Sequence, residues 1–586
     1  MRERLVVTIP AALALCTVGA AGEPRGTGPE LHGLRPPVLL PDGTEFRTWR
    51  PVLTFAKTYH VDGSAAGASD AGPGTKERPF RTIGKAAQVL CPGERVVVAG
   101  GVYREWVRPA RGGTGPEAMI SYQAEPGAKV VLKGSRVVRD RWGASPGAKG
   151  VWRLELRAGY FEYGDNPFAV PNVTPKQFDG MSWAQRWRGK QPYTLPRGLV
   201  FADGKRLLQV GSREELAKRE GTYFVGADGP TLHVHLAGGR SPNDAVLEIT
   251  TQQGIFAPEA IGLGYVHVKG FLVEHAGNAF PMPQWGAIST TRGHHWLIEG
   301  NTVRQVNGVG IDAGTQYWAL PQPKVRPGWH VIRRNTVTDC GVCGIQALGC
   351  RHSLIEDNVL ARNAFHPVER YYETGAIKTH GNVHTLIRRN RITETLHGGG
   401  IWMDFANVNS RCCRNVIVGS RTIHGAIFIE ASQQPNLIDR NVLWDTRGAG
   451  IYEHDCRGQI FAHNLIGACT GPAMWLRGKV TNRRVHGREI RSGDHTAVNN
   501  VFFETKELIR TKHAHRDTGG NVSAGIEARF DRRTGALTWR ATADVGACRG
   551  LKLVPRDFFD KPWPAACPPG PFAEIPRTPT TIDLLR

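Results

Sequence analysis

The sequence lacks the features of several common protein classes. Beyond its first 21 residues, the chain of 586 has no apolar run long enough to span a bilayer, which takes about 20 apolar residues. Lys and Arg number 74 against 52 Asp and Glu, for a formal charge of +22, but no basic helix or tail gathers them. We therefore expect no membrane span and no nucleic-acid partner, although a basic surface would suit an anionic polysaccharide.

Metal-binding patterns are also missing. Cys340 and Cys343 form a C-x-x-C pair with Cys350 close behind, but no second ligand pair of matching spacing completes a zinc site. No cluster of several acids suits Ca²⁺. We expect buried thiols or a local disulfide, no metal and no cofactor.

The N-terminus has the pattern of a secretory signal. Arg2 and Arg4 precede an apolar run from Leu5 to Val18, and small residues follow at positions 19–21. We predict that residues 1–21 are a signal peptide and that the protein is secreted, to the cell exterior or the periplasm.

One phrase recurs between residues 260 and 505. It consists of an alternating strand, an Asn, a second alternating strand, a Gly-containing turn and a third short strand. The recurring asparagines are Asn301, Asn335, Asn358, Asn390, Asn415, Asn441, Asn464 and Asn500. Three strands and three turns per repeat predict an all-β fold, a right-handed parallel β-helix of stacked coils. We expect each Asn to adopt the left-handed conformation at a turn and to bond to the Asn of the next coil.

The rest of the chain follows different patterns. A short amphipathic helix around residues 82–90 is expected to cap the first coil, and hairpin turns at Asp203-Gly204 and Asp228-Gly229 predict an inserted small β-sandwich. The predicted organisation is 22–135 for the N-terminal segment, capping helix and first coils, 136–252 for the insertion, 253–524 for the main β-helix, and 525–586 for an irregular C-terminal tail packed on it.

The third strand of each repeat carries the candidate chemistry. With the two-residue period of a strand, Asp404 and Glu430 occupy equivalent outward positions on adjacent coils, flanked by His380 and His454. Stacked strands lie about 4.8 Å apart, so we expect these carboxyl groups roughly 5–6 Å apart, close to the spacing in retaining glycosidases. Such a pair should titrate together, with one pKa raised.

A row of aromatic residues accompanies the acids on the same strands. Trp402, Phe428, Tyr452 and Trp475 take the outward position two residues earlier in their strands. Exposed rings of this kind stack against sugar rings. One acid breaks the pattern, because Glu453 falls at an inward position.

The stretch from Gly375 to Ile466 resembles glycoside hydrolase family 120. The matching segments are GAIKTH, GGGIWMDF, AIFIEASQQPNLIDRNVLW and FAHNLI. The resemblance implies a retaining β-xylosidase on a β-helix with an inserted β-sandwich, with Asp404 as nucleophile and Glu430 as general acid/base. Gln433 stands where that family commonly has His, and the turn between the two catalytic coils is longer here.

The expected function is therefore hydrolysis of glycosidic bonds in plant or cell-wall oligosaccharides. Candidate residues for holding the sugar hydroxyls are Glu373, Lys378, His380, Trp402, Gln433 and His454. Three alternatives stay open: a polysaccharide lyase or uronate epimerase with Lys378 or an Arg as base, a glycan-binding protein without activity, and a glycosidase for another sugar such as an α-L-fucoside.

Overall fold

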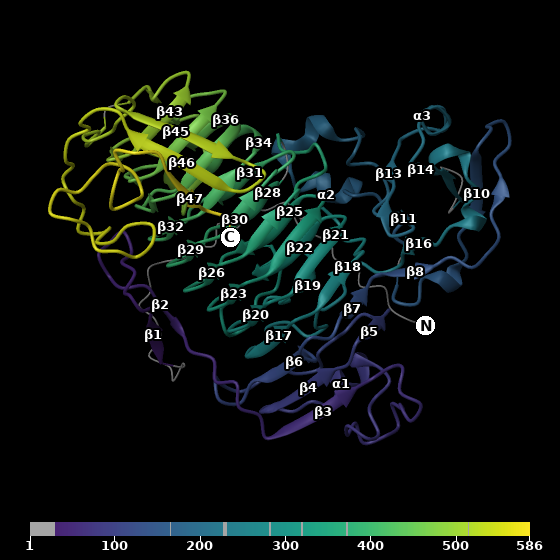
Figure 1. Ribbon diagram of the computed structural model, residues 1–586. Coiled ribbons are helices and arrows are strands. Elements are labelled where there is room, and N and C mark those ends of the chain that lie inside the picture. The colour runs from purple at the N-terminus through teal and green to yellow at the C-terminus, as the bar shows by residue number, and fades with distance from the viewer. Residues whose placement is uncertain are drawn as a thin grey trace.

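The computed structural model describes residues 30–164, 166–226, 231–280, 283–317, 320–370, 373–513 and 515–585. The predicted signal peptide and the predicted turn at Asp228-Gly229 lie outside these residues. Within them, the chain winds into stacked coils, and each coil adds strands to parallel sheets (Figure 1).

The coils form three parallel sheets, of which sheets 1 and 2 begin in the first coils and sheet 3 begins at β19. Sheet 1 has twelve strands, in the order β3 (Lys57–Val61), β4 (Glu94–Val98), β6 (Ile120–Ala124), β17 (Val266–Lys269), β20 (Leu297–Glu299), β23 (Val331–Arg333), β26 (Leu354–Glu356), β29 (Leu386–Arg388), β32 (Arg411–Cys413), β35 (Leu437–Asp439), β37 (Ile460–Ala462) and β42 (Thr496–Val498). Sheet 2 contains β5 (Gly101–Tyr103), β7 (Val130–Lys133), β18 (Leu272–Glu274), β21 (Thr302–Val306), β24 (Thr336–Cys340), β27 (Val359–Ala361), β30 (Arg391–Thr393), β33 (Val416–Val418), β36 (Val442–His454), β38 (Leu465–Cys469) and β43 (Val501–Thr505). Sheet 3 contains β19 (Gly286–Ser289), β22 (Val309–Gly314), β25 (Cys343–Leu348), β28 (Gly375–His380), β31 (Gly399–Asp404), β34 (Arg421–Glu430), β36, β39 (Met474–Leu476) and β44 (Ile509–Thr511).

The repeated asparagines form a continuous buried ladder. The amide of Asn390, for example, donates to Asn415 Oδ1 at 3.0 Å and accepts from Asn358 Nδ2 at 2.9 Å. The left-handed conformation, which we had assigned to the Asn itself, belongs to the residue before it, as at Arg389 (φ 52°) and Arg414 (φ 59°). At each turn, the residue before the Asn adopts the left-handed conformation, and the Asn side chain forms the hydrogen bonds to the neighbouring coils.

The N-terminal end of the stack is closed by α1 (Ile83–Val89). Thr82 caps this helix by accepting a hydrogen bond from the backbone N–H of Lys85. Ile83, Ala86 and Leu90 are buried in the same apolar core as the inward residues of the coils. The helix therefore shields the core where no further coil covers it.

Two sheets, antiparallel except for the parallel pair β13–β14, interrupt the coils after β7 and project to one side of the stack (Figure 1). Their strands are β8 (Ser135–Val137), β9 (Gly143–Ala144), β10 (Val151–Glu155), β11 (Val200–Ala202), β12 (Lys205–Arg206), β13 (Leu208–Gln209), β14 (Thr222–Val225), β15 (Thr231–His235) and β16 (Leu247–Thr250), with α2 (Pro175–Asp179) and α3 (Arg213–Lys218) between them. Leu154 and Leu232 from one sheet share a hydrophobic core with Val200 and Ile249 from the other, so the two sheets pack face to face.

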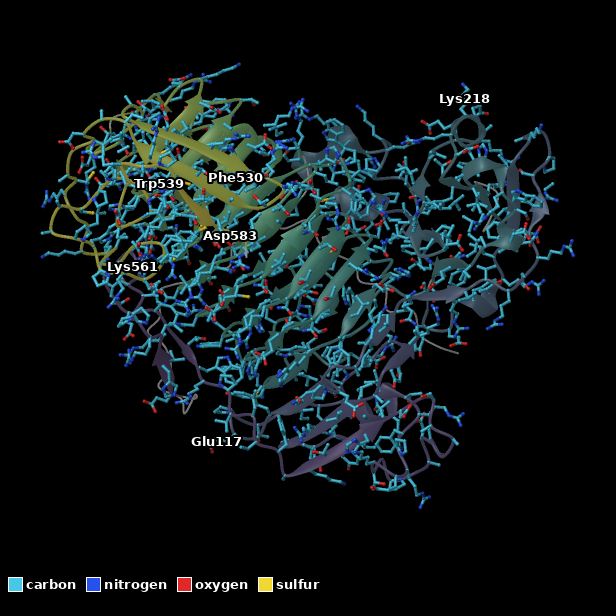
Figure 2. The ribbon with its side chains drawn as sticks, viewed as in Figure 1. Glu117, Lys218, Phe530, Trp539, Lys561 and Asp583 are labelled. Atoms are coloured by element: carbon cyan, nitrogen blue, oxygen red, sulfur yellow. The ribbon has the colours of Figure 1, made fainter. Side chains whose placement is uncertain are left out.

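The C-terminal segment is more regular than the sequence suggested. It contains a three-stranded antiparallel sheet of β45 (Ile526–Asp531), β46 (Ala536–Ala541) and β47 (Thr580–Asp583). Phe530 and Trp539, labelled in Figure 2, belong to one hydrophobic cluster with Val416 and Trp444 of sheet 2. The tail thus covers the outside of the coils that contain β33 and β36.

The ten cysteines of the described residues are all free thiols. Cys340, Cys343 and Cys350 are buried, and burial raises the pKa of each thiol. The helices in the described ranges are short, and none is long and apolar enough to cross a membrane.

Candidate active site

The register of sheet 3 aligns the predicted site residues across adjacent coils. His380 pairs with Asp404 between β28 and β31, and Glu430 pairs with His454 between β34 and β36. Between them, β31 pairs Met403 with Ile429, which brings Asp404 beside Glu430 in the next coil. The period of the sequence therefore predicted the correct strand pairing.

Asp404 is held through one carboxylate oxygen. It is 6% exposed, and its Oδ2 accepts a hydrogen bond from Lys378 Nζ at 2.6 Å and lies 3.0 Å from His380 Nδ1. No residue in the described part of the chain hydrogen-bonds to Oδ1. Burial raises the pKa of Asp404, but Lys378 and His380 outweigh it and hold the pKa well below its usual range. Asp404 is therefore an oriented anion with one oxygen available.

Lys378 is the buried cation of the site. Its side chain is fully buried, its ammonium contacts Glu373 as well as Asp404, and it lies 3.8 Å from the ring centroid of Trp402. Glu373, His380 and Asp404 place ligand atoms within 4.8 Å of one another, a geometry that could hold a metal ion. The ammonium of Lys378 already supplies the positive charge that these two carboxylates need.

Glu430 has a parallel arrangement on the next coil. It is 8% exposed, and its Oε1 lies 2.6 Å from Arg483 Nη1 and 3.1 Å from His454 Nε2. Burial and the neighbouring Asp404 raise the pKa of Glu430, but His454 and Arg483 outweigh them, so that the net shift is downward. Our expectation that one acid of the pair has a raised pKa is therefore wrong, because Lys378 lies beside Asp404 and Arg483 beside Glu430.

Sequence reasoning missed Arg483. It belongs to residues 477–495, which leave the repeat and form a short hairpin of β40 (Arg484–Val485) and β41 (Arg488–Glu489). Asp455 anchors this segment by accepting hydrogen bonds from the backbone N–H of Val480 at 2.6 Å and from Arg483 Nη2 at 3.0 Å. Nothing in the coil period signals the contact with Glu430, because it depends on how the hairpin folds back.

The aromatic row is less exposed than expected. Phe428 is 3% and Tyr452 1% exposed, and they pack with Trp402 and Trp475, which keep part of their surface accessible. His424 stacks on Phe428 with 4.5 Å between ring centroids. The row is outward with respect to the coil, but neighbouring side chains cover it: Lys378 lies over the Trp402 ring, and Phe428 stacks on the same ring from the next strand.

Two other residues make structural contacts. Gln433, a predicted sugar contact, donates to the backbone carbonyl of Asp455 and accepts from the backbone N–H of Arg491, so it braces the hairpin. The inward acid Glu453 is fully buried and accepts from the backbone N–H groups of Cys456 and Gly478. Its carboxylate thus satisfies turn donors that would otherwise lack partners.

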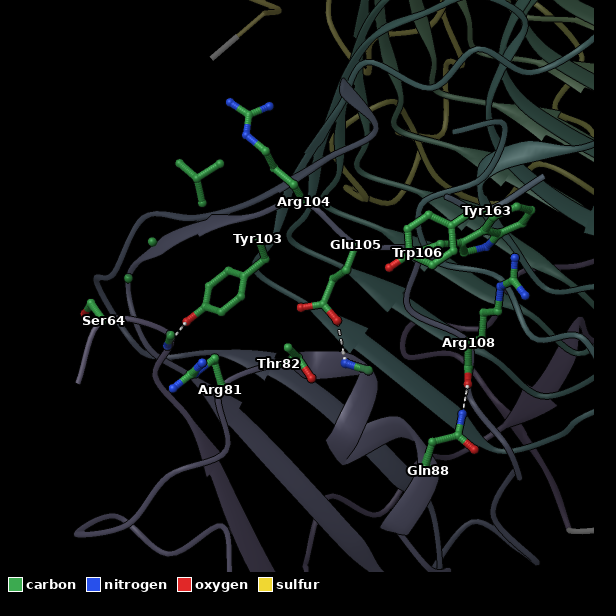
Figure 3. A pocket seen from close by; sticks show the side chains of 15 residues that line it. Ser64, Arg81, Thr82, Gln88, Tyr103, Arg104, Glu105, Trp106, Arg108 and Tyr163 are labelled. Carbon is green, nitrogen blue, oxygen red and sulfur yellow. Dashed lines mark hydrogen bonds between the residues drawn. The ribbon is translucent and has the colours of Figure 1, made fainter. Parts of the chain in front are cut away.

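A pocket of about 630 Å³ lies elsewhere, at the N-terminal coils (Figure 3). Trp106, Arg108 and Tyr163 form one wall, and Glu105 bonds to the start of α1. Arg108 is paired with Glu259, and the lining residues come from the first coils and the insertion. The pocket is therefore separate from the strands that carry Asp404 and Glu430.

Comparisons with known proteins agree with this architecture. A family model described as a right-handed β-helix region matches residues 286–466. A solved structure described as the complex of XylC with xylose has a TM-score of 0.71 and 22% identity, and the match covers 90% of this chain and 100% of that one. The chain is a right-handed parallel β-helix protein. The predicted fold class and the fold implied by the family resemblance are thus confirmed.

Other similar structures are more distant. A structure described as a glycoside hydrolase has a TM-score of 0.47 and 12% identity, with 80% of this chain and 96% of that one covered. A GH136 lacto-N-biosidase from Eubacterium ramulus has a TM-score of 0.42 and 14% identity, with coverage of 79% and 67%. No curated protein matches by sequence.

Proposed function

We propose that the protein is a carbohydrate-active enzyme, a retaining glycoside hydrolase with Asp404 as nucleophile and Glu430 as general acid/base. The observation that carries the proposal is the matched pair of carboxylates on adjacent coils. In each, one oxygen is held by two cationic or imidazole groups, and no described residue bonds to the other. Two neighbouring carboxylates, each with one oxygen left for the substrate, support a double-displacement reaction, whose first step uses the protonated form of Glu430.

The reaction has two steps. In the first, Asp404 Oδ1 forms a bond to the anomeric carbon, the glycosidic C–O bond breaks, and the leaving oxygen takes a proton from Glu430. In the second, Glu430 takes a proton from water, the water oxygen bonds to the anomeric carbon, and the Asp404 carboxylate departs. Lys378 and His380 stabilise Asp404 as an anion before the first step and after the second.

The sugar proposed for the donor side is β-D-xylose. The family resemblance around Asp404 and Glu430 supports it, and so does the similarity of the whole fold to XylC, whose structure was determined with xylose. Glu373 and Trp402 contact Lys378, and His380 contacts Asp404; these three residues are the proposed contacts for the sugar. An oligosaccharide substrate of this kind is typical of a secreted enzyme, and we propose that this protein is secreted.

A lyase or epimerase is less well supported. Such an enzyme needs a neutral base, whereas Glu373 and Asp404 stabilise the protonated form of Lys378 and raise its pKa despite burial. The test is hydrolysis of a panel of nitrophenyl glycosides, β-D-xyloside included, by wild type, Asp404→Ala and Glu430→Ala. We expect wild type to hydrolyse one of these glycosides, both variants to lose this activity, and azide to restore it in Glu430→Ala. Variants as active as wild type would exclude Asp404 and Glu430 as the catalytic pair.

A further inference from the structure

A segment from outside the repeat covers the ends of both proposed catalytic strands. We call residues 477–495 the basic hairpin. Its Val485 and Ile490 are buried in one hydrophobic cluster with Ala406 and Ala431. These alanines follow Asp404 by two residues and Glu430 by one. Apolar packing therefore fixes the hairpin at the exit of the two strands, where a leaving group would lie.

The hairpin has a strong excess of positive charge. It contains six Lys and Arg against two Asp and Glu. Its cations are Arg477, Lys479, Arg483, Arg484, Arg488 and Arg491. Within the described ranges, only Arg483 among these six forms an ion pair, and the other five are exposed. Glu489 lies opposite Arg484 in the hairpin, but the excess of positive charge remains and would favour the approach of an anion.

Two of these arginines contact the surroundings of the proposed acid/base. Arg483 is shared between Glu430 at 2.6 Å and Asp455 at 3.0 Å, and its side chain is 34% exposed. Arg477 donates to Tyr452 Oη at 2.9 Å, and that hydroxyl lies 3.2 Å from His454 Nδ1. Arg483 thus contacts Glu430 directly, whereas Arg477 is linked to it only through Tyr452 and His454, and both side chains keep part of their surface accessible to solvent.

We propose that the leaving-group side of the site binds a uronic acid, whose carboxylate takes over the contact that Arg483 makes with Glu430 in the structure. The inference rests on the proposed function. Guanidinium groups bind carboxylates through pairs of parallel hydrogen bonds, and the Asp455 contact keeps Arg483 in place during the exchange.

The exchange links substrate charge to proton transfer. Once Arg483 has turned to the uronate, burial and Asp404 favour the protonated form of Glu430. Glu430 then donates this proton to the glycosidic oxygen as the C–O bond breaks, and the uronic acid leaves with a hydroxyl group. A neutral saccharide leaves the Arg483 contact intact, so the pKa of Glu430 stays below its usual range and a smaller fraction of the enzyme has Glu430 protonated.

The test uses three substrates. Two are disaccharides with β-D-xylose linked to a uronic acid or to the primary amide of that acid, which has the same size and no charge. The third is 2,4-dinitrophenyl β-D-xyloside, whose leaving group needs no proton. The enzymes are wild type, Arg483→Gln, Arg483→Lys, and Arg540→Gln, which removes an ion-paired arginine from the C-terminal sheet.

For wild type and Arg540→Gln, kcat/KM should favour the acid over the amide by about tenfold or more, the equivalent of one charge-assisted hydrogen bond. In Arg483→Gln this ratio should fall to about one, and the pH limit for hydrolysis of the amide should move upward, because Glu430 loses a neighbouring cation. The ratio for Arg483→Lys should lie between those of wild type and Arg483→Gln, because lysine keeps the positive charge but cannot form the two parallel hydrogen bonds of a guanidinium group.

A ratio near one in wild type, or a ratio that Arg483→Gln leaves unchanged, overturns the uronate inference while the glycosidase proposal stands. Failure of wild type to hydrolyse the dinitrophenyl glycoside, or equal hydrolysis by Asp404→Ala, overturns the proposed function and the inference with it. Thermal unfolding of each variant shows whether a change in ratio comes from lost structure.

Discussion

Replacing Lys378 with methionine tests the electrostatic basis of the proposed site. Methionine has similar length but leaves Asp404 and Glu373 without the cation that both contact. Removing one partner of a buried ion pair costs about 3–5 kcal/mol, because an uncompensated charge remains buried. Glu373 keeps 17% of its side chain exposed and can be hydrated, so we expect the free energy of unfolding at neutral pH to fall by about 3 kcal/mol, the lower end of that range.

The effect of Lys378→Met on stability and on activity should depend on pH in a defined direction. The folded-state pKa of Asp404 lies below its unfolded value of about 3.9. A group with a lowered folded pKa contributes stability above the unfolded pKa and loses it as the pH falls through the folded pKa. Without Lys378, burial dominates and the pKa of Asp404 rises. The variant should therefore lose hydrolysis of an aryl glycoside at a higher pH than wild type as the solution is acidified, since the nucleophile must be ionised.

The assay is urea unfolding of wild type, Lys378→Met, Asp404→Asn and the double variant, together with pH profiles of kcat/KM for wild type and Lys378→Met. We expect a coupling free energy of about 2–3 kcal/mol between the two positions. Lys218→Met, at an exposed lysine of α3, is the matched control and should change neither measurement. Additive effects within about 0.5 kcal/mol, or superimposable pH profiles, would refute the reasoning.

Three further predictions follow from the geometry. In the presence of azide, Glu430→Gln should lower kcat/KM by about 100-fold or more for a glycoside with a sugar leaving group. The decrease should be much smaller for a dinitrophenyl glycoside, because only the sugar leaving group needs a proton. Equal decreases for both substrates would contradict this prediction. Asn415→Ala should lower the free energy of unfolding by about 2–4 kcal/mol, because it leaves buried groups of the adjoining coils unpaired. Asn521→Ala, at the partly exposed end of the Asn ladder, should lower it less in the same urea titration. Equal losses would argue against a continuous ladder. Arg411→Met should cost about 3 kcal/mol, because Arg411 is 1% exposed and bonds to Asp439 with two nitrogens; a loss below about 1 kcal/mol would show that Arg440 alone compensates Asp439.

The coil pairing could be predicted because it is local and periodic. The alternation of apolar and polar residues in each repeat shows which strand residues face inward. A shift of one residue in the strand pairing would turn all the inward apolar residues of a strand outward, so the register of Ile377, Ile401 and Ile427 follows from the sequence. The same argument aligned Asp404 beside Glu430. The Asn ladder followed for the same reason, although its turn conformation did not, because the left-handed residue is the variable one before the Asn.

Contacts made by non-repeating segments could not be predicted in this way. The three-stranded C-terminal sheet depends on β47 returning across nearly forty residues of irregular chain to pair with β46. The burial of Phe428 and Tyr452 depends on residues such as His424 that cover an outward face. A strand period shows which side of the sheet a residue occupies, but not what lies over it.

The sequence by itself determined the β-helix, the strand register and the adjacent positions of the two acids, because hydrophobic burial with a period of two and stacking at about 4.8 Å leave one consistent arrangement. Only the tertiary structure decided how those acids are charged. Lys378 stabilises Asp404 across one coil boundary, and Arg483 reaches Glu430 from a hairpin more than fifty residues later in the chain. Electrostatic interactions depend on distance in space, and for this hairpin no periodic signal in the sequence records that distance.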